Sequence, residues 1–422
     1  MGTEIDEFLR RFSEKNPHEP NFNQAVDEFV RSVMPVYLDN RNYRDAAVLE
    51  RLTEPDRVIQ FRVPWKDDDG NIRIQRGWRV QYSNCLGPYK GGLRFDEGVT
   101  LDALKFLAFE QTLKNSLTGL PMGGAKGGSN FDPKGKSQDE IMRFCESLMV
   151  ELYRYIGDDV DVPAGDIGVG SREIGYLFGH YLRLQNTWSG ILTGKGCSFG
   201  GSAGRPEATG YGCVRFCRAA LRHAGDDLEG KRIAISGSGT VALYAAEKAL
   251  DEGAVVVALS DSRGLACRSD GISREQLDEL IRAKEKERCT LREFAKGAAG
   301  IEYHDGRKSW SVECDIAMPC ATENELNAED AKKLIDNGVR AVCEGANMPC
   351  TAQAKRLFRD ADILFAPGKA ANAGGVAVSG MEITQNAMRR SWSREKVDEE
   401  LHDTMSNIHR LCVEHGSTQG GV

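Results

Sequence analysis

Residues 232–242 have the sequence RIAISGSGTVA, and this stretch decides the fold of the second half of the chain. Its first five residues are typical of a β-strand, and the turn Gly237-Ser238-Gly239 follows at once. The apolar spacing of residues 241–250 then predicts a helix, and residues 255–259 predict a buried strand that ends before Asp261. Strand, glycine-rich turn, helix, strand and acid, in this order, form the pattern of a dinucleotide-binding βαβ unit.

The residue types in this pattern suit a pyrophosphate. The two glycines let the backbone approach the ligand, the helix N-terminus supplies N–H groups, and Ala242 allows the helix to pack closely on the strand. Short apolar runs at 315–318, 340–343 and 362–365 predict further parallel strands whose carboxyl ends face a ligand crevice. We therefore predict a Rossmann-type dinucleotide-binding domain over residues 201–380.

The first 200 residues have a different pattern, typical of an α/β domain with a mixed sheet. Alternating apolar residues at 59–65 and 72–82, on either side of an acidic turn, predict a β-hairpin. We expect a helix over 101–117, a glycine-rich loop over 119–128, and a further helix over 137–155.

Two further segments complete the expected organisation. The Gly/Ser-rich stretch 194–204 is typical of a hinge between the two domains. Beyond the Rossmann domain, residues 381–422 predict a connecting helical segment.

Composition excludes several classes of function. At 422 residues the chain is too long for one ordinary core, and its 63 acids against 55 bases argue against a general nucleic-acid binder. An anionic small-molecule substrate would therefore need a local group of lysines. The longest apolar run, 254–259, is far shorter than the ~20 residues of a membrane span, so we expect no membrane association. The 12 cysteines show no C-x-x-C pair, and we predict reduced thiols in a cytoplasmic protein without a metal site.

Three lysines of the first domain are candidates for such a group. Lys90 and Lys126 stand in glycine-rich segments, and Lys114 follows Gln111 by three residues, which places both on one face of a helix. Each could be an ordinary solvated surface lysine. Lys126 differs because glycines flank it on both sides, and burial or a cationic neighbour would lower its pKa and make a neutral amine available. Asp166, also between glycines, either caps the helix that follows or transfers protons.

Several longer motifs resemble those of a known family. They are GPYKGGLRF (87–95), LPMGGAKGG (120–128), DVPAGDIGVG (161–170), RPEATG (205–210), EGAN (344–347) and APGKAANAGG (366–375). In this order they resemble the glutamate dehydrogenases of the Glu/Leu/Phe/Val dehydrogenase superfamily, in the NADP-type hexameric form. The resemblance implies that L-glutamate, 2-oxoglutarate and ammonium are the substrates, interconverted by hydride transfer to or from a nicotinamide cofactor.

The resemblance also implies roles for individual residues. Lys126 would activate water and stabilise a carbinolamine, and Asp166 would transfer protons. Gln111 and Lys114 would hold the α-carboxylate, and Lys90 and Ser379 the γ-carboxylate. The implied cofactor-binding residues are Arg205, Thr209, Gly237, Ser238, Gly239, Thr240, Val241, Asp261, Ser262, Ala321, Thr322, Asn347 and Asn372.

By the same resemblance, residues 1–200 would bind substrate and form the contacts of a homohexamer. The family has a last helix that returns to the first domain. This sequence ends at Gly420-Gly421-Val422, so we expect residues 381–422 to lack that helix.

We predict NADP as the preferred cofactor, with NAD possible. Asp261 taken alone favours NAD, because an acid at this position usually accepts hydrogen bonds from the ribose 2′-OH. Ser260, Ser262 and Arg263 offer two hydroxyl donors and a guanidinium, which suit a 2′-phosphate.

Two alternatives stay open from the residues. A branched-chain or aromatic amino-acid dehydrogenase would share the fold but carry an apolar residue in place of Lys90, since its substrate side chain is uncharged. A catalytically inactive nucleotide-binding regulatory protein would be expected to have lost Lys126 or Asp166, and both are present.

Overall fold

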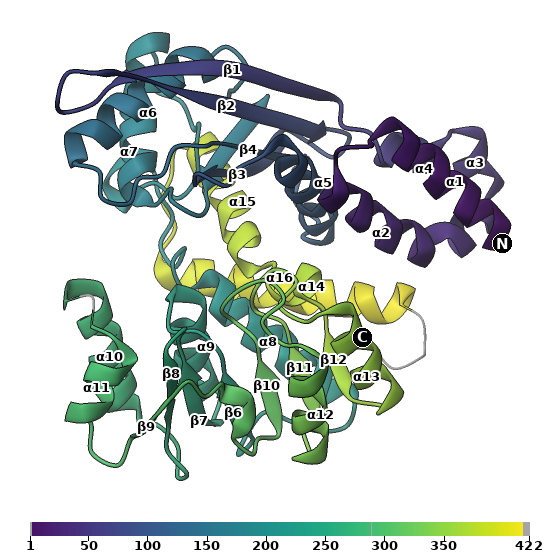
Figure 1. Cartoon of the computed structure of the whole chain (residues 1–422), viewed down its shortest axis with the longest axis vertical. Coiled ribbons are helices and arrows are strands. Elements are labelled where there is room, and N and C mark those ends of the chain that lie inside the picture. The colour runs from purple at the N-terminus through teal and green to yellow at the C-terminus, as the bar shows by residue number, and fades with distance from the viewer. Residues whose placement is uncertain (1, 288, 417–422) are drawn as a thin grey trace. The chain divides into compact units, whose positions relative to one another are not determined.

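A computed structural model of the chain describes residues 2–287 and 289–416. These residues form two compact units, each built around one β-sheet (Figure 1). The first unit contains residues 2–203 and 379–392, and the second contains residues 204–378 and 393–416. Among the helices in this part of the chain, none combines the length and the apolar character needed to cross a membrane.

The first unit contains five longer helices, two short ones, a 3-10 turn, five strands and the second half of α15. Its elements are α1 (Gly2–Lys15), α2 (Pro20–Asp39), α3 (Arg41–Asp45), α4 (Val48–Leu52), β1 (Arg57–Lys66), β2 (Ile72–Ser83), β3 (Tyr89–Phe95), α5 (Leu101–Leu117), β4 (Gly124–Ser129), α6 (Gln138–Leu152), β5 (Asp161–Gly165), α7 (Ser171–Gln185), η1 (Cys197–Phe199) and the second half of α15 (Gly374–Ala387). The sheet order is β1-β2-β4-β3-β5.

This first sheet is mixed, as the sequence predicts. Strands β1 and β2 form the expected antiparallel hairpin, and β2 also pairs antiparallel with β4. Strand β3 runs parallel to both β4 and β5, so it lies between β4, which contains Lys126, and β5, which ends directly before Asp166. Helix α5 packs on β4 and β2, and helices α6 and α7 pack on each other.

An aromatic core fixes α6 against the sheet. Phe131 and Phe144 stack with ring centroids 3.8 Å apart, and Phe95 of β3 meets Phe144 edge-on at 5.2 Å. The predicted capping box at the start of α6 is present, because Ser137 and Glu140 each accept a hydrogen bond from the backbone N–H of the other. Burial of large aromatic rings contributes most of the packing energy in such a core.

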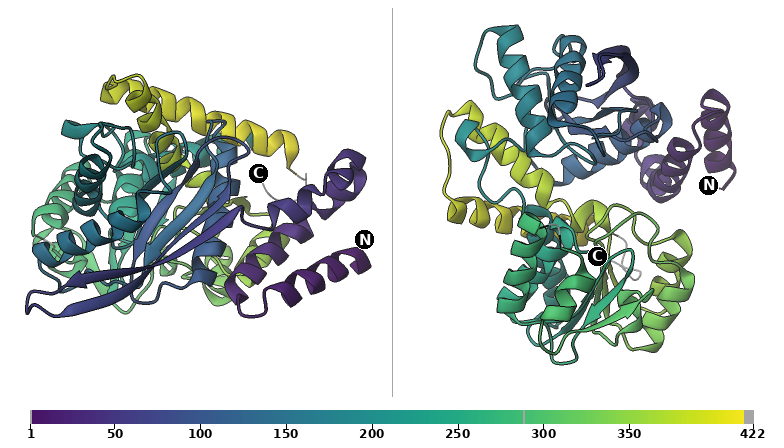
Figure 2. Two further views of the ribbon diagram at one scale, coloured as in Figure 1. Left: turned by 90° about the horizontal axis from the view of Figure 1, so that it is seen from above. Right: turned by 60° about the vertical axis from the view of Figure 1, so that its left-hand side comes forward.

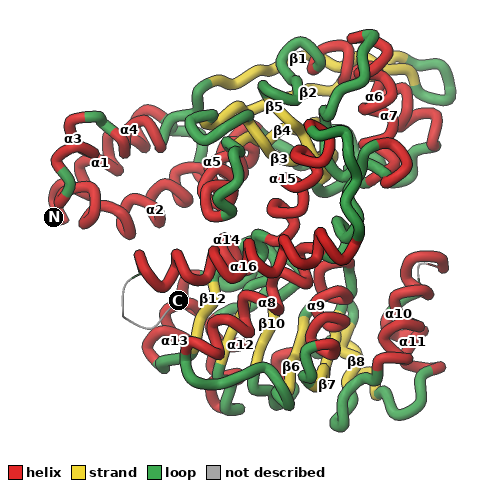
Figure 3. Tube along the Cα trace, turned by 180° about the vertical axis from the view of Figure 1, so that it is seen from behind, coloured by secondary structure: helices red, strands yellow, loops and turns green. Residues whose placement is uncertain are grey.

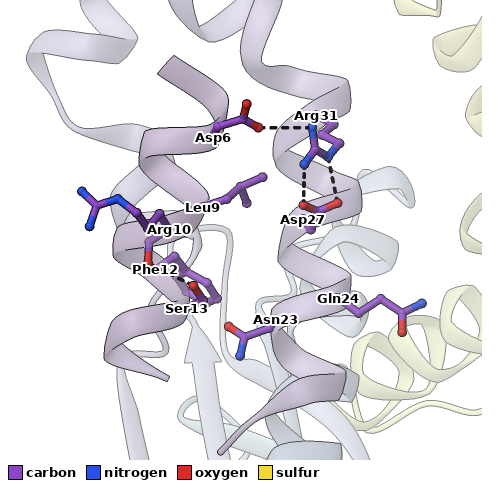
Figure 4. A pocket seen from close by; sticks show the side chains of 9 residues that line it. All are labelled: Asp6, Leu9, Arg10, Phe12, Ser13, Asn23, Gln24, Asp27 and Arg31. Carbon is purple, nitrogen blue, oxygen red and sulfur yellow. Dashed lines mark hydrogen bonds and ion pairs between the residues drawn. The ribbon is translucent and has the colours of Figure 1, made fainter. Parts of the chain in front are cut away.

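Helices α1 and α2 lie side by side and enclose a shallow groove of about 450 Å³ (Figures 2 and 4). Arg31 of α2 contacts Asp27 at 2.9 Å and Asp6 of α1 at 3.7 Å across the groove. These side chains are largely exposed, so the ion pairs contribute little to stability. The groove is lined by none of the residues that the sequence predicts for substrate or cofactor.

The second unit has the predicted βαβ pattern. Its elements are α8 (Ala208–His223), β6 (Arg232–Ile235), α9 (Thr240–Asp251), β7 (Val255–Ser260), β8 (Gly264–Cys267), α10 (Arg274–Glu287), α11 (Leu291–Gly297), β9 (Glu302–Asp305), η2 (Ser309–Ser311), β10 (Ile316–Met318), α12 (Ala328–Asp336), β11 (Ala341–Cys343), α13 (Ala352–Asp360), β12 (Leu364–Ala366), α14 (Gly368–Ala371), the first half of α15, and α16 (Arg394–His415).

The second sheet has the order β12-β11-β10-β6-β7-β8-β9, and Figure 3 shows the labelled strands from β12 to β8 in this sequence. Strands β12, β11, β10, β6 and β7 are parallel, as predicted for a Rossmann-type sheet. The last two strands, β8 and β9, add an antiparallel edge that the sequence analysis does not predict. The parallel part places the carboxyl ends of β6, β7, β10 and β11 along one edge of the sheet.

The C-terminal segment forms two helices where the sequence predicts one helical region from residue 381. Helix α15 begins earlier, at Gly374, and residues 388–393 separate it from α16, whose N-cap is Ser393. Helix α16 packs on α8, where Arg215 pairs with Asp398 at 2.6 Å. The expected absence of the family's last helix concerns the end of the chain, and residues 417–422 lie outside the described residues.

Candidate active site

Lys126 lies in the middle of β4, a strand whose six residues are all buried. The prediction of a loop over 119–128 is therefore wrong for its second half. The glycines are needed because neighbouring backbone comes very close: a Cβ on Gly91 would lie 1.6 Å from the carbonyl oxygen of Ala125, and one on Gly124 only 1.9 Å from Oγ1 of Thr112 in α5. The absence of side chains at Gly91 and Gly124 thus allows β4, the strand that carries Lys126, to pack closely against β3 and α5.

Each carboxylate oxygen of Asp166 contacts a different basic side chain. Its Oδ1 accepts a hydrogen bond from Nζ of Lys126 at 2.9 Å, and its Oδ2 accepts one from Nε of Arg94 at 2.6 Å. The alternative that Asp166 caps the following helix is wrong, because the N-cap of α7 is Gly170 and the Asp166 carboxylate is engaged with these bases. Arg94 has no assigned role in the sequence analysis, although it stands in the 87–95 motif.

Burial and charge set the protonation of this group. Burial lowers the pKa of Lys126, the Asp166 carboxylate raises it, and the guanidinium groups of Arg94 and Arg79 lower it, so that it lies below its usual value. Burial alone would raise the pKa of Asp166, but the charges of Lys126 and Arg94 lower it to about 2. The site therefore holds an ionised carboxylate beside a lysine whose neutral form is made more accessible.

Two glycines make this arrangement possible. A Cβ on Gly92 would lie 2.9 Å from Cβ of Asp166 and 3.4 Å from Nζ of Lys126, so a larger residue would push the two groups away. The turn after Asp166 passes through Gly168 at φ +73°, where a Cβ would lie 2.1 Å from the carbonyl oxygen of Phe95. Both positions favour glycine for steric reasons.

The residues predicted to hold the two substrate carboxylates all belong to the first unit. Lys90 lies on β3 with only 3% of its surface exposed, and Gln111 and Lys114 lie on α5, which packs on β3 and β4. Ser379, also 3% exposed, lies at the start of the part of α15 that belongs to this unit. Its neighbour Gly380 lies against Leu120 and Met122, in the segment that leads into β4.

Asn115 is a functional candidate that sequence reasoning missed. It is fully buried in α5 and accepts a hydrogen bond from Nε2 of Gln111 at 2.7 Å. Its own Nδ2 donates to the carbonyl oxygens of Lys90 at 3.1 Å and Gly123 at 2.5 Å. Asn115 thereby ties α5 to β3 and to the start of β4, and the signal for it was its position one helical turn after Gln111.

The predicted cofactor residues belong to the second unit. Gly237 and Gly239 form the turn between β6 and α9, and Gly237 has φ +90°, a conformation that favours glycine. Ser238 in this turn accepts a hydrogen bond from Nζ of Lys284 at 2.8 Å. Lys284 comes from α10, 46 residues away, and sequence reasoning missed it because a lysine in a charged helix carries no distinguishing pattern.

Asp261 follows β7 and its carboxylate is used inside its own turn. Oδ1 accepts hydrogen bonds from the backbone N–H groups of Arg263 at 2.9 Å and Gly264 at 3.1 Å. The neighbouring Ser262 and Arg263 are exposed. This carboxylate therefore has a structural role in the turn, which weakens the inference from Asp261 to NAD.

The other predicted cofactor residues lie at strand ends of the same sheet. Ala321 and Thr322 follow β10, and Asn347 follows β11. The Asn372 side chain donates from Nδ2 to the carbonyl oxygen of Ala346 at 2.9 Å and to Oδ1 of Asn347 at 3.1 Å. Asn372 is 5% exposed, and its Oδ1 accepts no hydrogen bond from any described residue. A buried carboxamide oxygen without a donor fits a ligand that supplies an N–H or O–H group, as a nicotinamide nucleoside does.

The start of α8 carries the last two predicted cofactor residues, Arg205 just before it and Thr209 in its first turn. A Cβ on Gly375 would lie 2.4 Å from Oγ1 of Thr209 and 3.5 Å from Nη1 of Arg205, so α15 begins directly against them.

Among the described residues, one group of three side chains has atoms close enough together to hold a metal ion. The ligand atoms of Cys267, Glu302 and His304 lie within 4.8 Å of one another on the β8–β9 edge. Glu302 is largely exposed and pairs with His304 at 3.3 Å. The cluster shares no residue with the predicted substrate or cofactor sites, and an exposed group of this kind does not by itself indicate a metal centre.

Comparisons with known proteins identify the family of this chain. Residues 200–421 match the glutamate/leucine/phenylalanine/valine dehydrogenase family, and residues 55–183 match its dimerisation domain. The chain is 54% identical to the NADP-specific glutamate dehydrogenase of Escherichia coli strain K12, over 98% of this chain and 92% of that protein. It is 49% identical to the NAD-specific glutamate dehydrogenase of Bacteroides fragilis, over 99% and 94% of the two chains.

A solved structure supports the same assignment. Plasmodium falciparum glutamate dehydrogenase superposes with a TM-score of 0.97 at 47% identity, covering 99% of this chain and 89% of that one. The α/β fold class and the family that the sequence motifs predict are thus both confirmed. This chain belongs to the glutamate dehydrogenases of the glutamate/leucine/phenylalanine/valine dehydrogenase family.

Proposed function

We propose that the protein interconverts L-glutamate with 2-oxoglutarate and ammonia, and that Lys126 and Asp166 carry the proton transfers. The observation that supports this most strongly is the contact of 2.9 Å between a buried lysine of lowered pKa and an ionised aspartate. Oxidation of an amino acid at Cα requires a neutral substrate amine before hydride leaves, and a base to activate the water that follows. Asp166 and the neutral form of Lys126 provide these two groups.

The residues have separate steps in this proposal. Asp166 accepts a proton from the substrate ammonium group, so that hydride can leave Cα and an iminium forms. Lys126 in its neutral form takes a proton from water as the water adds to the iminium carbon. The protonated lysine then stabilises the carbinolamine oxygen and gives its proton to the amino group. The C–N bond breaks, the hydroxyl proton leaves with the nitrogen as ammonium, and the ketone forms. Asp166 releases its proton to solvent, so both groups return to their starting state. Bound nicotinamide cofactor supplies the hydride acceptor.

The predicted substrate residues suit a dicarboxylate. We propose that Gln111 and Lys114 bind the α-carboxylate, while Lys90 and Ser379 bind the γ-carboxylate. Lys90 is 3% exposed, and its positive charge suits a substrate side chain that carries a negative charge better than an apolar one. This argues against a branched-chain or aromatic amino acid. The presence of Lys126 and Asp166 in contact argues against the alternative of an inactive regulatory protein.

NADP is the cofactor that we favour. The pyrophosphate would be held at the turn that contains Gly237–Val241 and the N-terminus of α9, and Asn347 and Asn372 would hold the nicotinamide end. The remaining predicted contacts are Arg205, Thr209, Ala321 and Thr322. An exposed Arg263 and a lysine that reaches the glycine-rich turn, Lys284, provide cations suited to a phosphorylated ribose. Relatives named for NADP and for NAD both exist, so the choice is part of the proposal.

For the whole chain we propose a cytoplasmic homohexamer. Residues 1–200 would bind substrate and form subunit contacts, residues 201–380 would bind the dinucleotide, and residues 381–422 would connect the two. The match of residues 55–183 to a dimerisation domain supports the assignment of subunit contacts to the first part of the chain. Light scattering of the purified protein during size exclusion gives the mass, and any mass other than six chains contradicts this assembly.

The activity is tested by following absorbance of the reduced cofactor with 2-oxoglutarate and ammonium. We expect oxidation that requires both substrates, and a higher kcat/KM with NADPH than with NADH. Replacing 2-oxoglutarate by the oxo acids of leucine or phenylalanine should give much lower rates. No ammonium-dependent oxidation with 2-oxoglutarate would contradict the proposal, and faster turnover of an apolar oxo acid would favour the alternative substrate class.

A further inference from the structure

We propose that Arg94 is a positioning residue for this reaction: it holds Oδ2 of Asp166 so that Oδ1 faces Lys126, and it supplies the second positive charge that allows the paired lysine to release its proton. The inference rests on the proposed function and assigns a role to a residue that the reaction scheme above does not use.

The geometry is specific to two adjacent strands. Arg94 on β3 pairs in register with Gly128 on β4, and Lys126 lies two residues before Gly128, so both basic side chains are on one face of the sheet. A Cβ on Gly92 would lie 2.9 Å from Cβ of Asp166 and 3.4 Å from Nζ of Lys126, so this glycine leaves room for both groups. Each carboxylate oxygen thus has its own donor, at 2.6 Å from Arg94 and 2.9 Å from Lys126.

Charge balance gives Arg94 its function. In a buried pair of Lys126 and Asp166 alone, loss of the lysine proton would leave an isolated carboxylate anion, which burial strongly disfavours. With Arg94 present, the same proton loss leaves a neutral arginine–aspartate ion pair. Arginine is the suitable residue type for this role because arginine side chains carry a permanent positive charge in proteins. With Arg94 present, Lys126 therefore loses its proton more readily, and its neutral form can act as a base.

The other charged groups near Lys126 do not replace Arg94. Arg79 on β2 is fully buried, but it donates to both oxygens of Asp161, from Nε at 2.9 Å and from Nη2 at 2.5 Å, so its charge is locally offset. Lys90 on β3 and Lys114 on α5 lie on elements packed against β4 and are unchanged in the variants below. Arg94, by contrast, contacts the carboxylate of Asp166 directly, and this is the same carboxylate that pairs with Lys126.

Burial makes the effect large enough to measure. The side chains of Arg94 and Asp166 are each 17% exposed, and that of Lys126 is 6% exposed, so water screens these charges only partly. Removing a charge within contact distance of a buried group typically shifts its pKa by about 1–3 units. Without Arg94 the pKa of Lys126 is expected to rise, because an interaction that lowers it is lost.

The test is the pH dependence of kcat/KM for glutamate oxidation in wild type, Arg94→Gln and Arg94→Lys. The acidic limb of the wild-type profile marks the loss of the neutral base. Arg94→Gln should move this limb to higher pH by about 1 unit or more and regain much of the lost rate on the alkaline side. Arg94→Lys keeps the charge, so its limb should stay close to that of wild type even if its rate falls. Arg62→Gln, which removes an exposed arginine from β1 of the same sheet, should leave the profile unchanged.

Each outcome decides the inference. A rate in Arg94→Gln that falls equally at every pH, with an unmoved limb, would show that Arg94 only supports the fold. If Arg94→Gln does not fold, Arg94→Lys alone is decisive: a limb that moves by about 1 unit with the charge retained contradicts the proposal, and an unmoved limb supports it. Wild type without any glutamate oxidation would instead refute the proposed function.

Discussion

Lys90→Leu should change which amino acid the protein prefers. Lys90 is on β3 with 3% of its surface exposed, and Asn115 holds its backbone carbonyl oxygen at 3.1 Å, so the strand itself should keep its position. Leucine is shorter than lysine and carries no charge. In the proposed complex it leaves the γ-carboxylate of glutamate buried without a cationic partner.

The expected size follows from that burial. Truncating one partner of a buried charge pair costs about 2–5 kcal/mol. Because each 1.36 kcal/mol is a tenfold change in rate, kcat/KM for glutamate should fall by about 30-fold to 5,000-fold. Norvaline, which has no side-chain charge, avoids this penalty, and its kcat/KM should be unchanged or higher.

The assay compares kcat/KM for glutamate and for norvaline in the two proteins. Lys134→Leu is a matched control, because Lys134 is an exposed lysine of the same unit and should leave the ratio unaltered. An unchanged ratio of the two substrates in Lys90→Leu would refute the assignment of Lys90 to the γ-carboxylate. An equal loss with both substrates would show that the substitution damaged the fold or the catalytic group instead.

Four further substitutions test other parts of the account. Lys126→Ala should lower kcat by at least about 100-fold, the range for losing an acid–base group, with unchanged cofactor affinity by titration; retention of more than about a tenth of kcat contradicts the role. The pKa of Asp166 is lowered to about 2, so its ionised carboxylate stabilises the fold at pH values above the unfolded-state pKa of about 4. This contribution is lost as the pH falls through about 2, so the difference in unfolding free energy between wild type and Asp166→Asn should shrink over that interval. A pH-independent difference contradicts this expectation. Arg263→Ala should weaken NADP binding by about 1–3 kcal/mol and hardly affect NAD, and equal losses measured by calorimetry would remove Arg263 from cofactor recognition. Glu382→Gln breaks a fully buried ion pair with Lys195 (2.8 Å) and should cost about 3–5 kcal/mol in denaturant unfolding, whereas a loss under about 1 kcal/mol would show that the pair is dispensable.

Local patterns predicted much of the fold. The strand–turn–helix–strand order around Gly237, the hairpin of β1 and β2, and the capping box of Ser137 depend on neighbours within a few residues, and each is present. The glycines around Lys126 were misread as a loop because a glycine required by close packing looks the same in sequence as one required by a turn. The close approaches of α5 to Gly124 and of Gly91 to the Ala125 backbone distinguish the two in the structure.

The missing site residues depend on contacts between distant parts of the chain. Arg94 and Asp166 are 72 residues apart, and Lys284 and Ser238 are 46 apart, so no periodic pattern connects them. Asp166 left two interpretations open in sequence because a glycine-flanked aspartate suits both a turn and a catalytic carboxylate. In the structure both oxygens contact bases and Gly170 is the N-cap of α7, which excludes the capping interpretation and leaves proton transfer as the proposed role.

The central claim is that this chain adds ammonia to 2-oxoglutarate through Lys126 and Asp166. The most direct measurement supplies 2-oxoglutarate, ¹⁵N-labelled ammonium and reduced cofactor to the purified protein and identifies the product by mass spectrometry. The account predicts L-glutamate with the label in its amino group, formed by wild type and by Lys134→Ala but not by Lys126→Ala. Unlabelled product, a different amino acid, or equal labelling by Lys126→Ala would contradict it.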